Sequence, residues 1–334
     1  MPPLDAVREA LRPRAFPERH DPAAAAAARA VAQQGGPAVR AIVFFGSRKT
    51  QARPDPYSAW DFFVLVSDYG AFYRSLGEAG ALRRSPALAS ALNAVMPPNS
   101  LALRAPDPGG GPPLLVKAAV VSLADFRRDT SARHRDHFLL GRLFQPAEIV
   151  LAADPEAARE ALDGLARASL LTYTWVRPWL PARFDVADYG RTLLRVSFSA
   201  EIRPEPTGRA EALWEAQQDA LRPVYSVLLA ALRASGELQE PTPGVYTLAR
   251  PVSAGERWRL VLYFRRSLLR ATARWAKYVV TFEGWLEFIL RKARRHTGED
   301  IVLTPRERRL PLLFLWPRVF RYLRHKDARG APPP

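Results

Sequence analysis

Two apolar runs separated by a polar segment constrain the fold more than any other part of the chain. The first run, residues 42–45, ends at Gly46 and Ser47. The second run, residues 62–66, follows one carboxylate, Asp61. Short apolar runs bounded by glycine and proline are typical of buried strands. The pattern therefore predicts a strand, a tight bend, a loop and a second strand with Asp61 at its mouth.

The residue types around the bend are suited to binding phosphate. Glycine lets the backbone approach a phosphate closely, because it has no Cβ. The Ser47 hydroxyl and neighbouring N–H groups can bind phosphate oxygens, and the Asp61 carboxylate can hold a divalent metal ion. The pattern therefore favours a nucleotidyl-transfer site. The alternative is an ordinary Gly-Ser turn of the kind found in many hairpins.

Composition narrows the classes of partner. The 334 residues suffice for two domains, or for one domain with a large appendage. Lys and Arg exceed Asp and Glu by 49 to 33, which gives a net charge of +16. Such a balance indicates a polyanionic partner: nucleic acid, an anionic membrane surface or a phosphorylated substrate. The chain has no cysteine, so disulfides, thiolate metal sites and a cysteine nucleophile are excluded.

The apolar patterns along the chain predict an α+β fold. We expect a nucleotidyltransferase-like mixed sheet flanked by helices in residues 1–152. A mostly helical second domain is expected at residues 153–250, and a basic amphipathic helical region at residues 251–330. Three further strands are predicted, at residues 101–103, 114–121 and 148–151. Residues 134–140 are expected to be helical.

The basic charge is concentrated toward the C-terminal end. Residues 263–334 contain 17 Lys or Arg and 6 Asp or Glu, so they carry +11 of the net +16. Basic residues around apolar, aromatic-rich helices are typical of helices that lie on an anionic membrane surface. The alternative is a helix packed on the protein with a solvated basic face. One apolar face is predicted from the helical spacing of Trp275, Val279, Phe282, Leu286 and Ile289.

No run of about 18 uncharged apolar residues occurs, so we expect no membrane-spanning helix. The first 21 residues have no apolar core of the signal-peptide type. Together with the basic region, this predicts a cytoplasmic protein that associates peripherally with the inner face of the membrane.

The predicted metal site lacks a second carboxylate. In the broad nucleotidyltransferase fold two carboxylates alternate along one strand, but the positions two residues from Asp61 are Ala59 and Phe63. Either another acid completes the site, or the chain binds nucleotide without turning it over. The candidate acids are Asp55, Asp68 and Asp125. Lys117, the one charge in the strand at 114–121, would either bind phosphate or pair with a carboxylate.

Several segments in a fixed order resemble the mitochondrial-type phosphatidate cytidylyltransferase family. The similarity covers roughly residues 40 to 225. It rests on FGSRKTQA, AWDFFVLVSD, PPNS, KAAVVS and HFLLGRLFQPAEIV, and a weaker similarity, which includes YGRTLLRVSFSAEIR, runs from Asp188 to Tyr225. The resemblance implies that CTP and phosphatidic acid react, with Mg²⁺, to give CDP-diacylglycerol and pyrophosphate at a membrane.

The resemblance also implies roles for individual residues. Gly46 and Ser47 would hold the triphosphate, and Asp61 would ligate the metal. Lys117 and Arg142 would neutralise phosphate charge as it shifts to the leaving pyrophosphate. Gln51 and Asn99 would be secondary nucleotide contacts.

Some of these residues have other interpretations. Arg142 could instead bond backbone carbonyls at a helix end, and Asn99 could be a turn residue. Arg48 and Lys49 stand where the family has a small residue; they would add phosphate contacts or indicate another acceptor. The alternatives for the whole chain are a nucleotidyltransferase acting on RNA, protein or another phosphate acceptor, and an inactive nucleotide- or membrane-binding adaptor.

Overall fold

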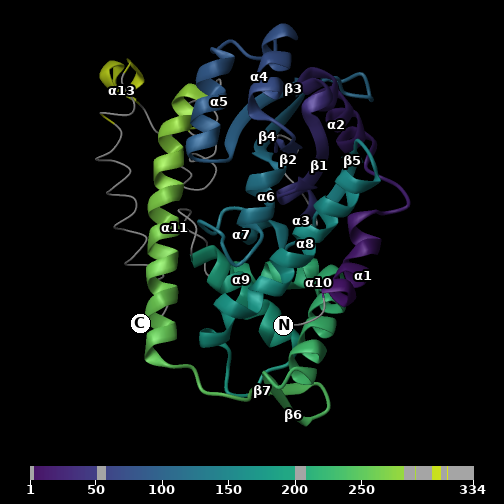
Figure 1. The fold of residues 1–334 in the computed structure, drawn as a ribbon, viewed down its shortest axis with the longest axis vertical. Coiled ribbons are helices and arrows are strands. Elements are labelled where there is room, and N and C mark those ends of the chain that lie inside the picture. The colour runs from purple at the N-terminus through teal and green to yellow at the C-terminus, as the bar shows by residue number, and fades with distance from the viewer. Residues whose placement is uncertain are drawn as a thin grey trace.

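The computed structural model describes residues 4–50, 58–199, 208–281 and 303–309, and the single positions 290 and 314. The protein is a mixed α+β structure with a five-stranded sheet flanked by helices (Figure 1). The sheet confirms the predicted fold class at this level. None of the described helices combines the length and apolar character that crossing a membrane requires.

The sheet has the strand order β3-β4-β2-β1-β5. Strands β2 and β4 are parallel, and every other neighbouring pair is antiparallel. All five predicted strands are present, each one to four residues longer than its apolar run. The strands are β1 (Val39–Phe45), β2 (Trp60–Val66), β3 (Asn99–Ala105), β4 (Leu114–Ser122) and β5 (Glu148–Ala152).

One face of the sheet packs against an alanine-rich helix. Ile42, Phe44 and Phe62 of the central strands lie on this face and are buried. Helix α2 (Pro22–Gly35) covers them, because its alanine side chains let the helix approach the sheet closely. Helices α4 (Tyr69–Glu78) and α5 (Pro86–Val95) extend this layer. The Asp21 side chain accepts hydrogen bonds from Ala23 N and Ala24 N and so begins α2.

The opposite face of the sheet shares its core with a group of helices. Val43, Phe63 and Val121 from the sheet belong to the same buried cluster as Trp175 and Tyr225 from those helices. The sheet region at 1–152 and the helical region at 153–250 are therefore joined by one continuous core. The helices around this core are α1 (Leu4–Ala15), α6 (Leu123–Asp129), α7 (Leu140–Leu143), α8 (Pro155–Val176), α9 (Val186–Ser199) and α10 (Arg209–Ala234). A hairpin of β6 (Leu238–Thr242) and β7 (Val245–Leu248) closes the helical region.

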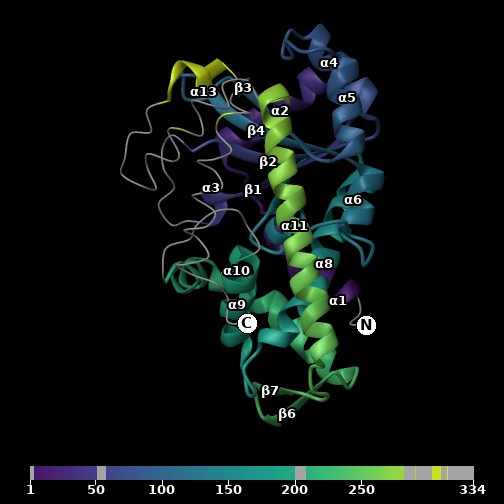
Figure 2. The same cartoon turned by 90° about the vertical axis from the view of Figure 1, so that its left-hand side faces the viewer.

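A 28-residue helix, α11 (Ala254–Thr281), runs along one side of the molecule (Figures 1 and 2). Near its start Glu256 pairs with Arg177 at 2.5 Å, and near its end Lys277 Nζ donates to Asn99 Oδ1 at 2.9 Å. The helix therefore contacts both the helical region and the sheet. A short helix, α13 (Pro305–Arg309), is the last described element.

Two expectations for the later part of the chain have different outcomes. Residues 134–139 form turns rather than a helix, because Asp129 and Asp136 bond backbone N–H groups nearby. The predicted apolar face of Trp275, Val279, Phe282, Leu286 and Ile289 lies outside the described side chains, so it stays a prediction.

Candidate functional site

The bend after β1 brings Gly46 directly against Asp61. Gly46 has φ +91°, which favours glycine, and a Cβ placed there would lie 2.5 Å from Asp61 Oδ2. The contact follows from the sheet register, because Phe45 pairs with Asp61 across β1 and β2. Asp61 is the second residue of β2 rather than a loop residue before it. The strand, bend and acid expected from the sequence thus meet in space.

Lys117 joins this arrangement from the neighbouring strand. Asp61 pairs with Lys117 across the parallel strands β2 and β4, so both side chains lie on the same face of the sheet. Lys117 Nζ lies 3.9 Å from Asp61 Oδ1. This is longer than a hydrogen bond of about 2.7–3.2 Å. Both side chains keep about a fifth of their surface exposed, so the two charges are close and open to a ligand. We call Gly46, Ser47, Asp61 and Lys117 the Gly46–Asp61 corner.

Ser47 and Arg48 are fixed near Ser58. Ser47 Oγ lies 3.5 Å from Ser58 Oγ, and Arg48 Nε donates to the Ser58 carbonyl at 2.9 Å. The Arg48 guanidinium also lies 4.5 Å from the centre of the Trp60 ring. Burial lowers the pKa of Arg48 from its ordinary value, although the charges of Asp21 and Asp61 act in the opposite direction. Arg48 therefore adds a half-buried positive charge beside the corner.

Lys49 is held by a buried acid on β5. Its Nζ donates to Glu148 Oε2 at 2.5 Å, and His20 Nδ1 contacts the other oxygen of the same carboxylate. Glu148 is 1% exposed and pairs with Phe44, on the face opposite to Asp61. Lys49 thus anchors the bend to the sheet edge, and its charge is matched by an acid that the sequence analysis did not single out. The sequence predicted only that Glu148 begins a strand at residues 148–151, and not that its side chain pairs with Lys49.

Arg142 lies further along the face that carries Asp61. Its guanidinium is 4.0 Å from the centre of the Phe138 ring, and that ring packs edge-on against Phe63, two residues beyond Asp61. Arg142 Nη1 also donates to the Phe138 carbonyl at 2.8 Å. The carbonyl contact is the kind that the alternative interpretation predicted, and the phosphate contact of Arg142 stays a prediction.

Asn99 is not grouped with the corner. It pairs with Val120, three positions beyond Lys117 on β4, and its side chain lies on the opposite face. The side chain is completely buried, and its Nδ2 donates to Tyr73 Oη and to the Ala89 carbonyl, each at 2.8 Å. Asn99 thus joins α4, α5 and β3, a structural role for the asparagine.

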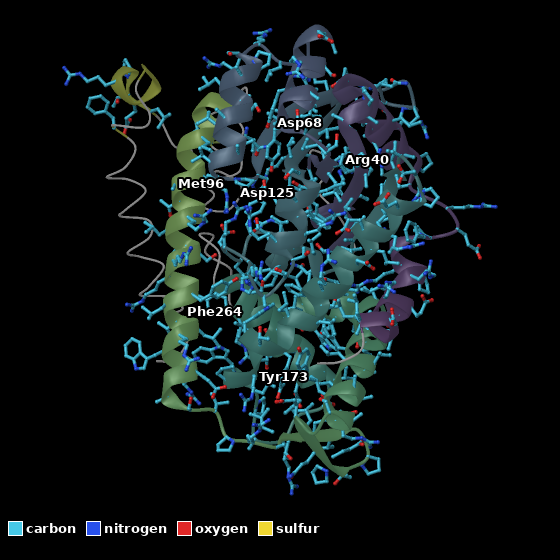
Figure 3. The ribbon with its side chains drawn as sticks, viewed as in Figure 1. Arg40, Asp68, Met96, Asp125, Tyr173 and Phe264 are labelled. Carbon is cyan, nitrogen blue, oxygen red and sulfur yellow. The ribbon has the colours of Figure 1, made fainter. Side chains whose placement is uncertain are left out.

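Two of the three acids proposed to complete the metal site lie at the other end of the sheet. Asp68 follows the end of β2 and accepts a hydrogen bond from Ala71 N, so it begins α4. Asp125 follows β4; it accepts from Tyr69 Oη at 2.5 Å and pairs with Arg128 and Arg135. Figure 3 labels both acids. The third acid, Asp55, and the predicted contact Gln51 lie outside the described residues.

The fit of Mg²⁺ to this site depends on the substrate. Among the described residues no group of three or more His, Cys, Asp or Glu side chains could hold a metal ion. Mg²⁺ is often bound through one or two carboxylates together with substrate phosphates and water. Asp61 is partly exposed and lies beside the bend, so it suits that mode of binding. The remaining ligands would come from a triphosphate.

No protein-family model matches the chain, and no curated protein is significantly similar to it.

Proposed function

We propose that the protein is a metal-dependent nucleotidyltransferase that transfers the cytidylyl group of CTP to phosphatidic acid. The observation that carries the proposal is the contact between the Gly46 bend and the Asp61 carboxylate, with Lys117 on the same row of the sheet. The choice of CTP and phosphatidic acid rests on the resemblance to the mitochondrial-type phosphatidate cytidylyltransferase family. The Gly-Ser bend, the acid and the segment around Arg142 follow one another in this chain in the order that the resemblance requires. The net charge of +16 supports anionic substrates.

The proposed reaction is a single in-line displacement. A phosphate oxygen of the acceptor forms a bond to the α-phosphorus of CTP while the bond from that phosphorus to the β-phosphate oxygen breaks. Pyrophosphate leaves with the electron pair of that bond. A bound Mg²⁺ would supply neutralising charge to the triphosphate.

The residues contribute position and charge. Gly46 allows the backbone to approach the triphosphate, and the Ser47 hydroxyl donates to a phosphate oxygen. Lys117 and Arg142 carry positive charge toward the phosphates as charge develops on pyrophosphate. Because attack is direct, catalysis needs orientation and charge neutralisation and no covalent enzyme intermediate.

Incubation of the full chain with labelled CTP, phosphatidic acid vesicles and Mg²⁺ tests the proposal. We expect CDP-diacylglycerol and pyrophosphate in equal amounts. Correctly folded protein that forms no CDP-diacylglycerol would contradict the lipid acceptor. Pyrophosphate release that requires added RNA or protein instead would favour the alternative acceptors, and CTP binding without any turnover would favour the adaptor.

The two lysines beside the bend should respond differently to the same substitution. Lys117→Met should weaken CTP binding by at least about tenfold, because an ammonium that contacts phosphate is lost. Lys49→Met should leave the CTP dissociation constant within about twofold. It should lower the free energy of unfolding by about 1–3 kcal/mol, because the buried Glu148 carboxylate loses a charged partner. Calorimetric titration with CTP and urea unfolding measure the two effects. If both variants lost CTP affinity equally, the assignment of phosphate binding to Lys117 and of a structural role to Lys49 would be contradicted.

A further inference from the structure

The outward side of α11 carries a row of large apolar side chains. Trp258, Leu262 and Leu269 are 62%, 57% and 71% exposed. At 3.6 residues per turn their positions fall within an arc of about 40°, over a length of about 16 Å. Figure 2 shows α11 in front of the rest of the fold. Three large apolar side chains aligned in this way need an explanation, although single ones do not.

The inward side of α11 is already occupied by the body of the protein. Phe264 packs against His137 and Trp175, and Ser267 Oγ accepts from His137 N at 2.9 Å. Further along, Arg270 and Arg274 pair with Asp136. Figure 3 labels Phe264 on this helix. The helix is therefore fixed with Trp258, Leu262 and Leu269 directed away from the core.

Arginines border the apolar row on both sides. By helical position Arg259 and Arg266 lie on one side of the row and Arg265 on the other, and all three are exposed. The only acid on α11 is Glu256, which pairs with Arg177. The row and its border thus combine apolar side chains with positive charge that pairs with none of the acids in the described ranges. That combination suits a surface that is anionic outside and apolar just beneath, which is the surface of an anionic bilayer.

We propose that this face of α11, made of Trp258, Leu262 and Leu269 with Arg259, Arg265 and Arg266, docks the protein on anionic membranes. The face lies upstream of the apolar positions expected from the sequence, and it belongs to a helix rigidly attached to the sheet. The inference deepens the proposed function by naming the surface through which the enzyme would meet its lipid. It does not depend on catalysis, because docking can be measured without CTP.

Flotation of the full chain with lipid vesicles tests the proposal. Wild type should bind vesicles of equal parts phosphatidylcholine and phosphatidylglycerol, and bind pure phosphatidylcholine vesicles much less. The variant Trp258→Ala/Leu262→Ser/Leu269→Ser should bind at least about tenfold more weakly, because it loses most of the apolar area that enters the bilayer. The variant Arg259→Gln/Arg265→Gln/Arg266→Gln should lose affinity for the anionic vesicles on the order of a hundredfold.

A matched control lies on α5. Leu88 and Val95 are 47% and 77% exposed. Leu88→Ser/Val95→Ser removes exposed apolar area elsewhere and should leave flotation unchanged. Vesicle binding by the α11 apolar variant equal to wild type would overturn the proposal. If that variant floats like wild type and also has a lower molecular mass than wild type in light scattering, the face binds a second copy of the chain, and the proposal is likewise overturned.

Activity separates this inference from the proposed function. One outcome is that the α11 variants keep wild-type turnover of phosphatidic acid dispersed in detergent and still fail to float. This result would confirm that the α11 face serves docking and is not needed for catalysis. If wild type floats and the α11 variants do not, but no protein turns over CTP, the docking inference stands and the proposed function fails.

Discussion

Asp61→Asn is expected to reduce nucleotidyl transfer by at least about a hundredfold while the protein stays folded. The substitution keeps the shape of the side chain but removes the one described carboxylate that touches the Gly46 bend. Without its charge the corner holds a divalent ion poorly, and the triphosphate loses its fixed position. Stability should change little, because Asp61 is partly exposed and its contact with Lys117 is 3.9 Å long. Labelled CTP turnover and thermal unfolding measure the two expectations.

Asp68→Asn is the matched control for this prediction. It makes the same chemical change at the other end of the same strand, and asparagine also begins helices well. Turnover should therefore stay near wild type. If Asp61→Asn and Asp68→Asn had equal activity, the Gly46–Asp61 corner would not be the site of reaction.

The sheet was predictable because its signal is local. Each strand is a short apolar run between turn residues, and residues 42–45 and 62–66 are buried on both faces in the structure. Strand order is a different matter. The parallel pairing of β2 with β4 places Lys117 beside Asp61, and 55 residues separate the two along the chain. Neither the residue types nor their spacing in the sequence predicts that Lys117 and Asp61 are neighbours.

The candidate site was only partly predictable for the same reason. Gly46, Ser47 and Asp61 form a recognisable local pattern, and the structure brings them together. Glu148 was missed, because its pairing with Lys49 depends on β5 lying next to β1. Asn99 was assigned to the nucleotide from its place in a motif, yet its register on β3 directs it to the opposite face. A shift of one residue in a strand reverses the face, so register decides such assignments.

The outward row on α11 shows how packing selects among possible helix faces. The sequence of α11 contains apolar residues around much of its circumference, so helical spacing alone allowed more than one apolar face. The packing of Phe264 against the core and the burial of Arg274 and Lys277 fix the helix rotation and leave Trp258 and Leu269 exposed. The attachment of α11 is therefore a requirement for the docking surface.

Asp136 is the buried acid that pairs with two arginines of α11. It is 4% exposed, accepts from Arg270 Nε at 2.8 Å, and pairs with Arg274, which is also buried. Burial by itself would raise the pKa of the Asp136 carboxyl. The charge of Arg274, with the bonds from Arg270 and Phe138 N, more than offsets burial and holds that pKa below its usual range.

Asp136→Asn should lower the free energy of unfolding at neutral pH by about 3–5 kcal/mol, because it leaves the buried Arg274 charge without its carboxylate. A carboxylate with a lowered folded-state pKa stabilises the protein above its unfolded pKa of about 3.9. That stabilisation is lost as the pH falls through the folded-state pKa. The difference between the two proteins should therefore be constant from about pH 5 to 8 and shrink below about pH 4.

Urea unfolding across this pH range measures the effect, with Glu9→Gln as the control. Glu9 pairs with Arg12 at 3.0 Å, but both side chains are more than half exposed. Its loss should leave unfolding essentially unchanged. If Asp136→Asn fails to fold, Arg270→Gln offers a milder test, because Arg270 is partly exposed and Arg274 keeps its carboxylate. Unfolding of Asp136→Asn at the wild-type urea concentration would show that the ion pairs of Asp136 with Arg270 and Arg274 add nothing to the attachment of α11.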